Sequence, residues 1–368
     1  MTLALALATL VLQSPSAQAQ TYTVIHAFTG GTDGQYPYAG LTLDSAGNQY
    51  GVTQGGGTFG YGTVFEFNTS GQESVLFNFR GPAQKGGDPD GVLFRDAAGT
   101  LYGTTVYGGI LLSAGTVFAI SSSGGTRQWR NLPGEPFAGV IADPHGNLYG
   151  TTYASVFEVR NNSVKVLHNF TGTPDGTDCQ ASLHRDAAGN LYGTTLFGGL
   201  FNAGTVFKID TAGNETVLYS FTGGADGGHP SGSLIEDVAG NLYSTTGNGG
   251  TYAQGTVFKL DTNGNETVLY SFAGGTDGLA PIAGLTNDPE GNFYGTTLGG
   301  GSGFGTVFKL DITGKETVLY RFTGGKDGGS PYAGVVRDQH GNLYGTAYVG
   351  GDFGCYKFGC GVVYRVKP

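Results

Sequence analysis

Aspartate residues recur in glycine-rich loops of the sequence, and their carboxylates are the first candidates for chemistry. The loops have the form GGxDG or a close variant, and the aspartates are Asp33, Asp175, Asp226, Asp277 and Asp327. A carboxylate and neighbouring carbonyl oxygens can bind Ca²⁺, but each loop supplies one carboxylate and none matches the D-x-[DN]-x-[DN]-G pattern of calcium loops. Asp-Gly is also a frequent turn dipeptide. The sequence therefore favours a turn at each aspartate, with calcium binding as the weaker alternative.

Histidine side chains, which often act as acids, bases or metal ligands, are scattered through the chain. The six are His26, His145, His168, His184, His229 and His340. A metal site or an acid–base pair needs two or three such groups on one face. The sequence also contains no G-x-S-x-G elbow, H-E-x-x-H pair, P-loop or dinucleotide fingerprint. We therefore predict no catalytic residue and no cofactor-binding residue.

A long repeat must position these side chains. The phrase GNLYG and its variants place a tyrosine at Tyr50, Tyr102, Tyr149, Tyr192, Tyr243, Tyr294 and Tyr344, 43 to 52 residues apart. Three further phrases, typified by GTVF, ETVLYSF and AGLTLD, recur with the same period. Each unit thus holds four strand-like segments of about six residues separated by Gly, Asn and Asp turns, which is the pattern of one propeller blade. We expect the repeated tyrosines to pack between blades.

The order of the segments predicts how the ring closes. The last unit ends after its third segment, and the missing fourth segment, TYTVIHAF, stands at the other end of the chain and finishes at Phe28. A strand over about residues 21–28 would pair with residues 361–366 and leave no open blade edge. The sequence therefore predicts an all-β, seven-bladed propeller with four antiparallel strands per blade, in which residues 20–368 form a single domain.

Composition and charge agree with this architecture and exclude several classes of protein. The chain has 70 Gly among 368 residues without a G-X-Y period, and 12% aromatic residues, which argues against collagen and against a disordered linker. A net charge of −10 argues against nucleic acid as a partner, because binding it requires a basic surface. No segment is long enough and apolar enough to predict a membrane span.

The repeated phrase GNLYGTT…GG…GTVFKLD…GxETVLYSFTGG.DG resembles the GloVer-type ("choice-of-anchor") tandem repeat of exported bacterial proteins. The resemblance covers about residues 22–366. It implies an exported bacterial protein of a family with no established activity.

The first residues and the cysteines also favour export. An apolar run from Leu3 to Leu12 precedes an A-x-A motif that ends at Ala19, so we predict a signal peptide over residues 1–19 and an extracellular, periplasmic or cell-surface location. In an oxidising compartment, Cys355 and Cys360 are close enough in sequence to form a disulfide. Cys179 is then left over, and the sequence assigns it no role.

Loop length separates two faces of the predicted propeller. Tight Asp-Gly-Asn turns join strands one to two and three to four of each blade, whereas the other links are longer and share the opposite face. Ligand contacts concentrate in long loops on rigid scaffolds. Departures from the repeat in these links, and in the strand that leads into one of them, give the ligand-binding candidates Trp129, Arg130, Tyr153 and Lys85. His229 is a further candidate, because it is the one histidine in a long link.

Three functions remain open at this point. The first is a non-catalytic binding or scaffold module for a polysaccharide or a cell-surface partner, and the second is a polysaccharide lyase or glycoside hydrolase with its site on the long-loop face. The third is a self-associating extracellular matrix or filament component. Repeated loops favour multivalent binding or assembly, whereas missing catalytic motifs disfavour an enzyme.

Overall fold

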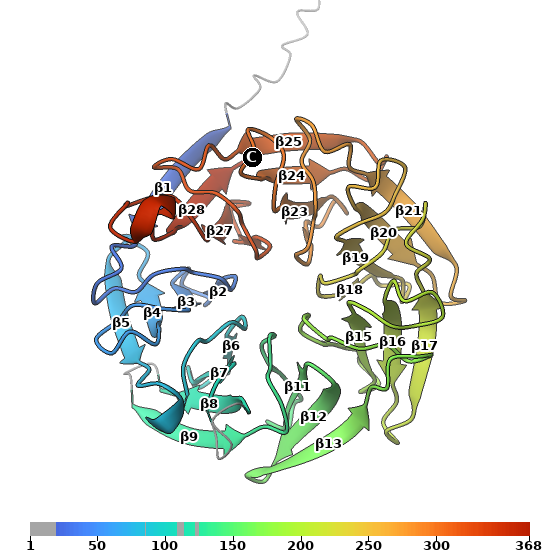
Figure 1. Cartoon of the computed structure of the whole chain (residues 1–368), viewed down its shortest axis with the longest axis horizontal. Helices are drawn as coiled ribbons and strands as arrows, with labels where there is room; N and C mark the ends of the chain where they lie inside the picture. The colour runs from blue at the N-terminus through green and yellow to red at the C-terminus, as the bar shows by residue number, and fades with distance from the viewer. Residues whose placement is uncertain (1–19, 85, 109–113, 122–124) are drawn as a thin grey trace, which may run out of the picture.

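The chain folds into a β-propeller. The computed structural model describes residues 20–84, 86–108, 114–121 and 125–368. In this part of the chain the strands form seven four-stranded antiparallel sheets arranged around a ring (Figure 1). The predicted fold class is thus confirmed, whereas Lys85 and the predicted signal peptide at residues 1–19 lie outside the described residues.

The strands follow the sequence repeat. Blades 1 to 3 are formed by β2 (Thr42–Leu43), β3 (Gln49–Thr53), β4 (Thr63–Phe67) and β5 (Glu73–Asn78); β6 (Phe94–Arg95), β7 (Leu101–Thr105), β8 (Thr116–Ile120) and β9 (Thr126–Asn131); and β10 (Ile141–Ala142), β11 (Leu148–Thr152), β12 (Ser155–Arg160) and β13 (Ser163–Asn169). Blades 4 to 6 are formed by β14 (His184–Arg185), β15 (Leu191–Thr195), β16 (Thr205–Ile209) and β17 (Glu215–Ser220); β18 (Ile235–Glu236), β19 (Leu242–Thr246), β20 (Thr256–Leu260) and β21 (Glu266–Ser271); and β22 (Thr286–Asn287), β23 (Phe293–Thr297), β24 (Thr306–Leu310) and β25 (Glu316–Arg321). Blade 7 is formed by β26 (Val336–Arg337), β27 (Leu343–Ala347), β28 (Val362–Lys367) and β1 (Thr21–Ala27).

The two ends of the chain close the ring. The sheet order of blade 7 is β1-β28-β27-β26, so the first strand of the chain is the outermost strand of the last blade. β1 runs antiparallel to β28, with Thr21 opposite Lys367 and Ala27 opposite Val362. The predicted pairing of the N-terminal segment with the C-terminal one is confirmed.

A pair of aromatic rings fills most blade junctions. The ring that ends the outer strand of one blade meets the ring of the GTVF segment in the next, as in Phe28 and Phe65, whose centroids are 5.3 Å apart. The last junction replaces the second phenylalanine with a tyrosine, and Phe322 meets Tyr364 at 5.1 Å. A Cβ on Gly51 would lie 2.4 Å from the Phe65 ring. The final glycine of GNLYG therefore makes room for this pair.

The innermost strands are shorter than the sequence predicts. Each has only two residues in the structure, whereas we expected about six. The segments before them converge on the axis so closely that a Cβ on Gly139 would lie 2.0 Å from the carbonyl oxygen of Val92 in the neighbouring blade. Because segments of neighbouring blades already touch there, the inner segments cannot continue as paired strands.

Each repeated tyrosine braces the turn that precedes its strand. The hydroxyl of Tyr294 donates to Asp288 Oδ2 at 2.9 Å, and Asn292 donates to the same carboxylate from its backbone and its side chain. These bonds outweigh the effect of burial and lower the pKa of Asp288. The same tyrosine–aspartate bond occurs in Tyr50–Asp44, Tyr102–Asp96, Tyr149–Asp143, Tyr192–Asp186, Tyr243–Asp237 and Tyr344–Asp338. Besides the packing between blades that we expected, each of these tyrosines therefore also holds a turn in place.

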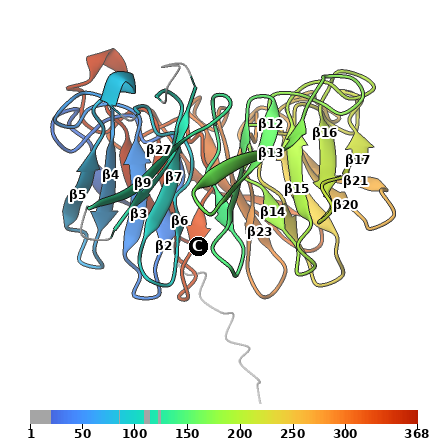
Figure 2. The same cartoon turned by 90° about the horizontal axis from the view of Figure 1, so that it is seen from below.

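Long links share one face, which we call the upper face. It comprises the links between the second and third strands of a blade and those between one blade and the next. Two short 3₁₀ helices mark it, η1 (Pro82–Gln84) and η2 (Tyr356–Phe358), one in each kind of link. Both lie at the same end of the propeller in side view, with the tight turns at the other end (Figure 2).

Candidate ligand-binding face

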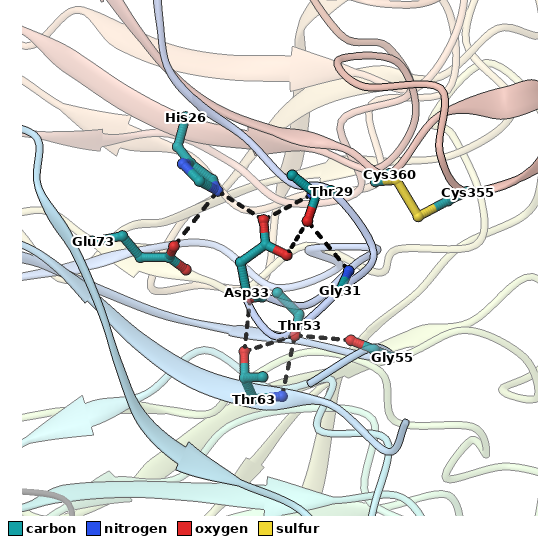
Figure 3. A network of polar contacts seen from close by, with 10 residues as sticks. All are labelled: His26, Thr29, Gly31, Asp33, Thr53, Gly55, Thr63, Glu73, Cys355 and Cys360. Atoms are coloured by element: carbon teal, nitrogen blue, oxygen red, sulfur yellow. Dashed lines mark hydrogen bonds and ion pairs between the residues drawn. A yellow bond between two sulfur atoms is a disulfide. The ribbon is translucent and has the colours of Figure 1, made fainter. Parts of the chain in front are cut away.

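The repeated aspartates of the upper links hold their own loops together. Asp33 Oδ2 accepts the backbone N–H of Thr29 at 2.8 Å, and its Oδ1 accepts the Thr29 hydroxyl at 2.6 Å (Figure 3). Asp175 and Asp226 accept the same pair of donors from Thr171 and Thr222. Asp327 binds Thr323 in this way, and Asp277 accepts the backbone N–H of Ala273. Each carboxylate therefore closes a five-residue turn of its own chain.

A side chain from the preceding outer strand completes each of these turns. Tyr219, Tyr270 and Tyr320 donate their hydroxyls to Asp226, Asp277 and Asp327 at 3.0 to 3.1 Å. His26 and His168 take this place at Asp33 and Asp175, with Nε2 to Oδ2 distances of 3.2 and 3.1 Å. Burial by itself would raise the pKa of Asp33, but the hydrogen bonds from His26 and Thr29 outweigh it and lower that pKa.

The residues singled out from the sequence lie in different environments. Trp129 packs against Phe77, Phe79 and Phe118. Arg130 Nη1 donates to the carbonyl oxygen of Trp129 at 2.6 Å.

Tyr153 and His229 lie on the upper face. Tyr153 forms the exposed tip of the short β11–β12 hairpin. The His229 ring contacts Phe197 edge-on at 5.0 Å, and its Nδ1 lies 3.1 Å from Asn248 Nδ2. Among the described residues, the structure therefore does not bring these sequence-derived candidates together in one site.

Two of the three cysteines form a disulfide, and the third is a free thiol. Cys355 and Cys360 form the predicted disulfide within the β27–β28 link. Cys179 is a buried free thiol, and burial raises its pKa well above the usual value. The disulfide therefore closes a loop within the longest of the links between second and third strands.

A cluster of tyrosines stands at the upper mouth of the central channel. Tyr36 stacks on Tyr348 with ring centroids 5.0 Å apart, and Tyr38 stacks on Tyr332 at 4.7 Å. Tyr348 also meets Tyr332 edge-on at 5.2 Å, so the four rings form one group. Tyr38 and Tyr332 line a cavity of about 250 Å³ on the axis of the ring, together with small residues of the inner segments.

Asp90 lines the same cavity from blade 2. Asp90 is only 8% exposed, and Gln54 Nε2 donates to its Oδ1 at 2.8 Å. Gln54 in turn accepts the hydroxyl of Tyr348 at 3.3 Å, which connects the carboxylate to the tyrosine cluster. Burial raises the pKa of Asp90 to about 7, with the hydrogen bond from Gln54 opposing and the charge of Asp88 adding to the effect. This carboxyl group can therefore hold or release a proton near neutral pH.

The sequence contained a signal for this cavity that our reasoning missed. In each unit, one residue stands directly before an alanine or glycine in phrases such as PYAG (residues 37–40) and PDGV (residues 89–92). Its side chain varies while its surroundings repeat, as in Tyr38, Asp90, Gln180, Ile282 and Tyr332, all of which line the cavity. Asp90 thus corresponds to Tyr38 and not to the repeated aspartates such as Asp33.

Exposed aromatic rings surround this mouth. Among the described residues, the aromatic side chains that are more than about a third exposed all belong to the links between second and third strands. They are Phe59, Tyr61, Tyr107, Tyr153, Phe197, Phe201, Tyr252, Phe304, Phe353 and Phe358. Every blade contributes at least one ring, so the upper face presents a discontinuous aromatic rim.

Comparison with known families places the chain. The model of the Gloeobacter/Verrucomicrobia repeat matches residues 11–158 and 153–364. The chain belongs to this family. No curated protein matches it. In the described part of the chain, no helix is long and apolar enough to cross a membrane.

Solved structures similar to this family member share its fold. The extracellular domain of a protein assigned as a one-component system in B. thetaiotaomicron has a TM-score of 0.58 at 15% identity. That match covers 94% of this chain and 41% of the other, so the chain spans about two fifths of that protein's length. A fungal alcohol oxidase of the AA5 family, in complex with copper, has a TM-score of 0.63 at 14% identity over 95% of this chain and 77% of its own. At these identities the likeness concerns the propeller fold alone.

Proposed function

We propose that this protein is an exported binding module that holds a carbohydrate chain at the mouth of its central channel. The observation that supports this most directly is the group of Tyr36, Tyr38, Tyr332 and Tyr348 beside Asp90 and Gln54. Tyrosine combines an apolar ring face with a hydroxyl, which suits a sugar ring that has C–H faces and hydroxyl edges. A concave site lined by aromatic rings and a few convergent polar groups is the usual form of a ligand pocket.

Charge narrows the class of carbohydrate. The protein carries a net charge of −10, and the carboxylates of Asp90 and Asp88 lie near the cavity mouth. Like charges repel an anionic polymer, so we expect neutral polysaccharides to bind better than uronic-acid or sulfated ones. The aromatic rim would add weak contacts to a long chain that leaves the central site.

A polysaccharide screen tests this function. Neutral and acidic polymers are titrated against the protein by calorimetry, and each mixture is assayed for new reducing ends and unsaturated sugars. We expect binding of at least one neutral polymer without products, and about 30-fold weaker binding for Tyr332→Ala, since a central tyrosine contact is often worth about 2 kcal/mol. Tyr252→Ala, on the rim, is the matched control and should bind nearly as wild type. Equal binding by all three proteins would remove the channel mouth as the site.

Asp90 gives the enzymatic alternative its specific support. A carboxyl group with a pKa of about 7 is suited to donate a proton at neutral pH. If the protein were a glycoside hydrolase or lyase, products would appear in the same screen and Asp90→Asn would abolish them while leaving binding intact. Absence of products with a polymer that does bind would leave the binding module as the function.

A further inference from the structure

Three side chains meet at the outer rim where blade 7 joins blade 1. His26 belongs to β1, Asp33 to the link that follows it, and Glu73 begins β5 of the next blade (Figure 3). One potential metal-ligand atom from each lies within 4.8 Å of the other two. Among the described residues, this is the only group of three such side chains with this spacing. The group therefore joins the strand that closes the ring to the first complete blade.

The spacing of these atoms matches a metal coordination sphere. His26 Nε2 lies 3.2 Å from Asp33 Oδ2 and 3.7 Å from Glu73 Oε2. In tetrahedral zinc sites, bonds of about 2.0–2.1 Å place neighbouring ligand atoms roughly 3.4 Å apart. An imidazole with two carboxylates is a ligand set that suits a divalent transition metal. Side-chain exposures of 13% to 23% leave room for water as a further ligand.

Comparison with the other blades shows that the turn does not require this histidine. Tyr219, Tyr270 and Tyr320 occupy the same place in their units and brace the aspartate through a hydroxyl. A tyrosine hydroxyl makes that hydrogen bond, whereas a neutral imidazole adds a nitrogen lone pair that can bind a metal. The substitution of histidine for tyrosine thus changes the chemistry of the position without changing its structural role.

A cation at this point would take the place of a proton between two side chains. Asp33 Oδ2 accepts the Thr29 N–H and lies 3.2 Å from His26 Nε2, so a metal ion would replace the proton that these two atoms share. Glu73 Oε2 lies 3.7 Å from the same imidazole nitrogen, so the ion would also balance the negative charge of both carboxylates. The other oxygen, Oε1, is buried without a hydrogen-bond partner among the described residues, but this is a feature of the repeat, shared by Glu215, Glu266 and Glu316.

We propose that His26, Asp33 and Glu73 bind a divalent transition metal ion of the zinc type. The ion would connect β1 of blade 7 to β5 of blade 1, close to the disulfide of the same sector (Figure 3). This site is separate from the channel mouth and does not depend on the proposed carbohydrate binding.

The chain contains a matched control for this proposal. His168 lies 3.1 Å from Asp175 in the corresponding place between blades 3 and 4. Glu215, which begins β17 as Glu73 begins β5, interacts electrostatically with both, but among the described residues only the His26 group has all three ligand atoms within 4.8 Å of one another. Both His26→Tyr and His168→Tyr install the residue that other units use. Either variant should therefore fold, and only the first should affect the metal site.

Calorimetric titration of the full chain with ZnCl₂, after treatment with chelator, tests the site. We expect one ion per chain for the wild type and for His168→Tyr, no binding at that site for His26→Tyr, and at least about tenfold weaker binding for Glu73→Gln, because the latter loses an anionic ligand. Zinc should also raise the melting temperature of the wild type and of His168→Tyr, but not that of His26→Tyr.

Two results would overturn the proposal. One is the absence of zinc binding by the wild type, and the other is unchanged stoichiometry and affinity in His26→Tyr, which would place the ion on another histidine. Melting curves without metal show whether His26→Tyr is folded. If it is not, Glu73→Gln decides alone, and undiminished binding by that variant would equally exclude the site.

Discussion

The sector where the ring closes differs from the sector opposite it. In blades 4 to 6 the junctions are built alike, with an aromatic pair such as Phe272 and Phe308 and a Tyr–Asp brace such as Tyr270 and Asp277. The closure sector, blades 7, 1 and 2, adds the β1–β28 pairing, the disulfide, the tyrosine cluster and the His26 group. Repetition here accounts for architecture, and the candidate sites lie where repetition fails.

Removal of the closing strand should have the largest effect on this comparison. A chain that begins at Gly30 lacks β1 and Phe28, which exposes the edge of β28 and empties one aromatic junction. We expect this chain to aggregate or to lose its cooperative melt. Light scattering measures the first outcome and calorimetry the second. A chain that begins at Gln20 is the control and should melt as the full chain does. A cooperative melt near the control temperature would show that closure adds little to stability.

Loss of the disulfide should have the next largest effect. The double variant Cys355→Ser/Cys360→Ser frees a short loop, and the chain-entropy estimate for a loop of this size is about 2 kcal/mol of unfolding free energy. Denaturant melts with and without reductant measure it. Reductant should destabilise the wild type and leave the double variant unchanged; equal sensitivity of both proteins would contradict the assignment.

Tyr364 offers a test in which the closure sector gains stability. Its hydroxyl is fully buried and has no partner among the described residues, whereas the other units carry phenylalanine there. Tyr364→Phe should raise the unfolding free energy by about 1 kcal/mol, since an unpaired buried hydroxyl costs at least that much. The reverse change in the regular sector, Phe308→Tyr, should lower it. Destabilisation by Tyr364→Phe would reveal a partner for that hydroxyl.

Substitution of the glutamates at the regular junctions should have the smallest effect on stability, and this effect should depend on pH. Burial, with the charge of Asp226 or Asp277 nearby, raises the pKa of Glu266 and of Glu316 from the usual 4.5 to about 7. The folded state therefore favours the protonated form, and this stability is present below about pH 4.5 and lost as the pH rises through about 7.

Glutamine variants isolate this effect. Glu266→Gln and Glu316→Gln should raise the melting temperature at pH 8 and change it little at pH 4.5. Unchanged melting temperatures of both variants at pH 8 would contradict a raised pKa at these two glutamates.

Much of the fold followed from counting. The period of GNLYG gave the number of blades, and the displaced segment ending at Phe28 gave the closing strand. Short-range pairs were also accessible, because Cys355 and Cys360 lie five positions apart. The length of the inner strands was not accessible, because it depends on how closely different blades approach at the axis, as Gly139 and Val92 do.

Side-chain groups that cross blades were the features that the sequence concealed. Tyr36 meets Tyr348, and Asp90 meets Gln54, only after the ring has closed. Trp129 was a ligand-binding candidate because it departs from the repeat, and in the structure its ring packs against Phe118 of the neighbouring strand. The position of a residue within a repeat predicts the strand on which it lies. It says less about which side chain of another unit that residue will contact.

The pairing of β1 with β28 also constrains how the protein can be made. Thr21 is among the first described residues to be synthesised and Lys367 is among the last, yet they are partners in one sheet. The hairpins of blades 1 to 6 join neighbouring segments and can form while the chain grows, whereas β1 has to wait, unpaired, for the C-terminal segment. Assembly of the ring is therefore a final, long-range event, and an arrested or truncated chain keeps an unpaired strand whose backbone groups are available to other molecules.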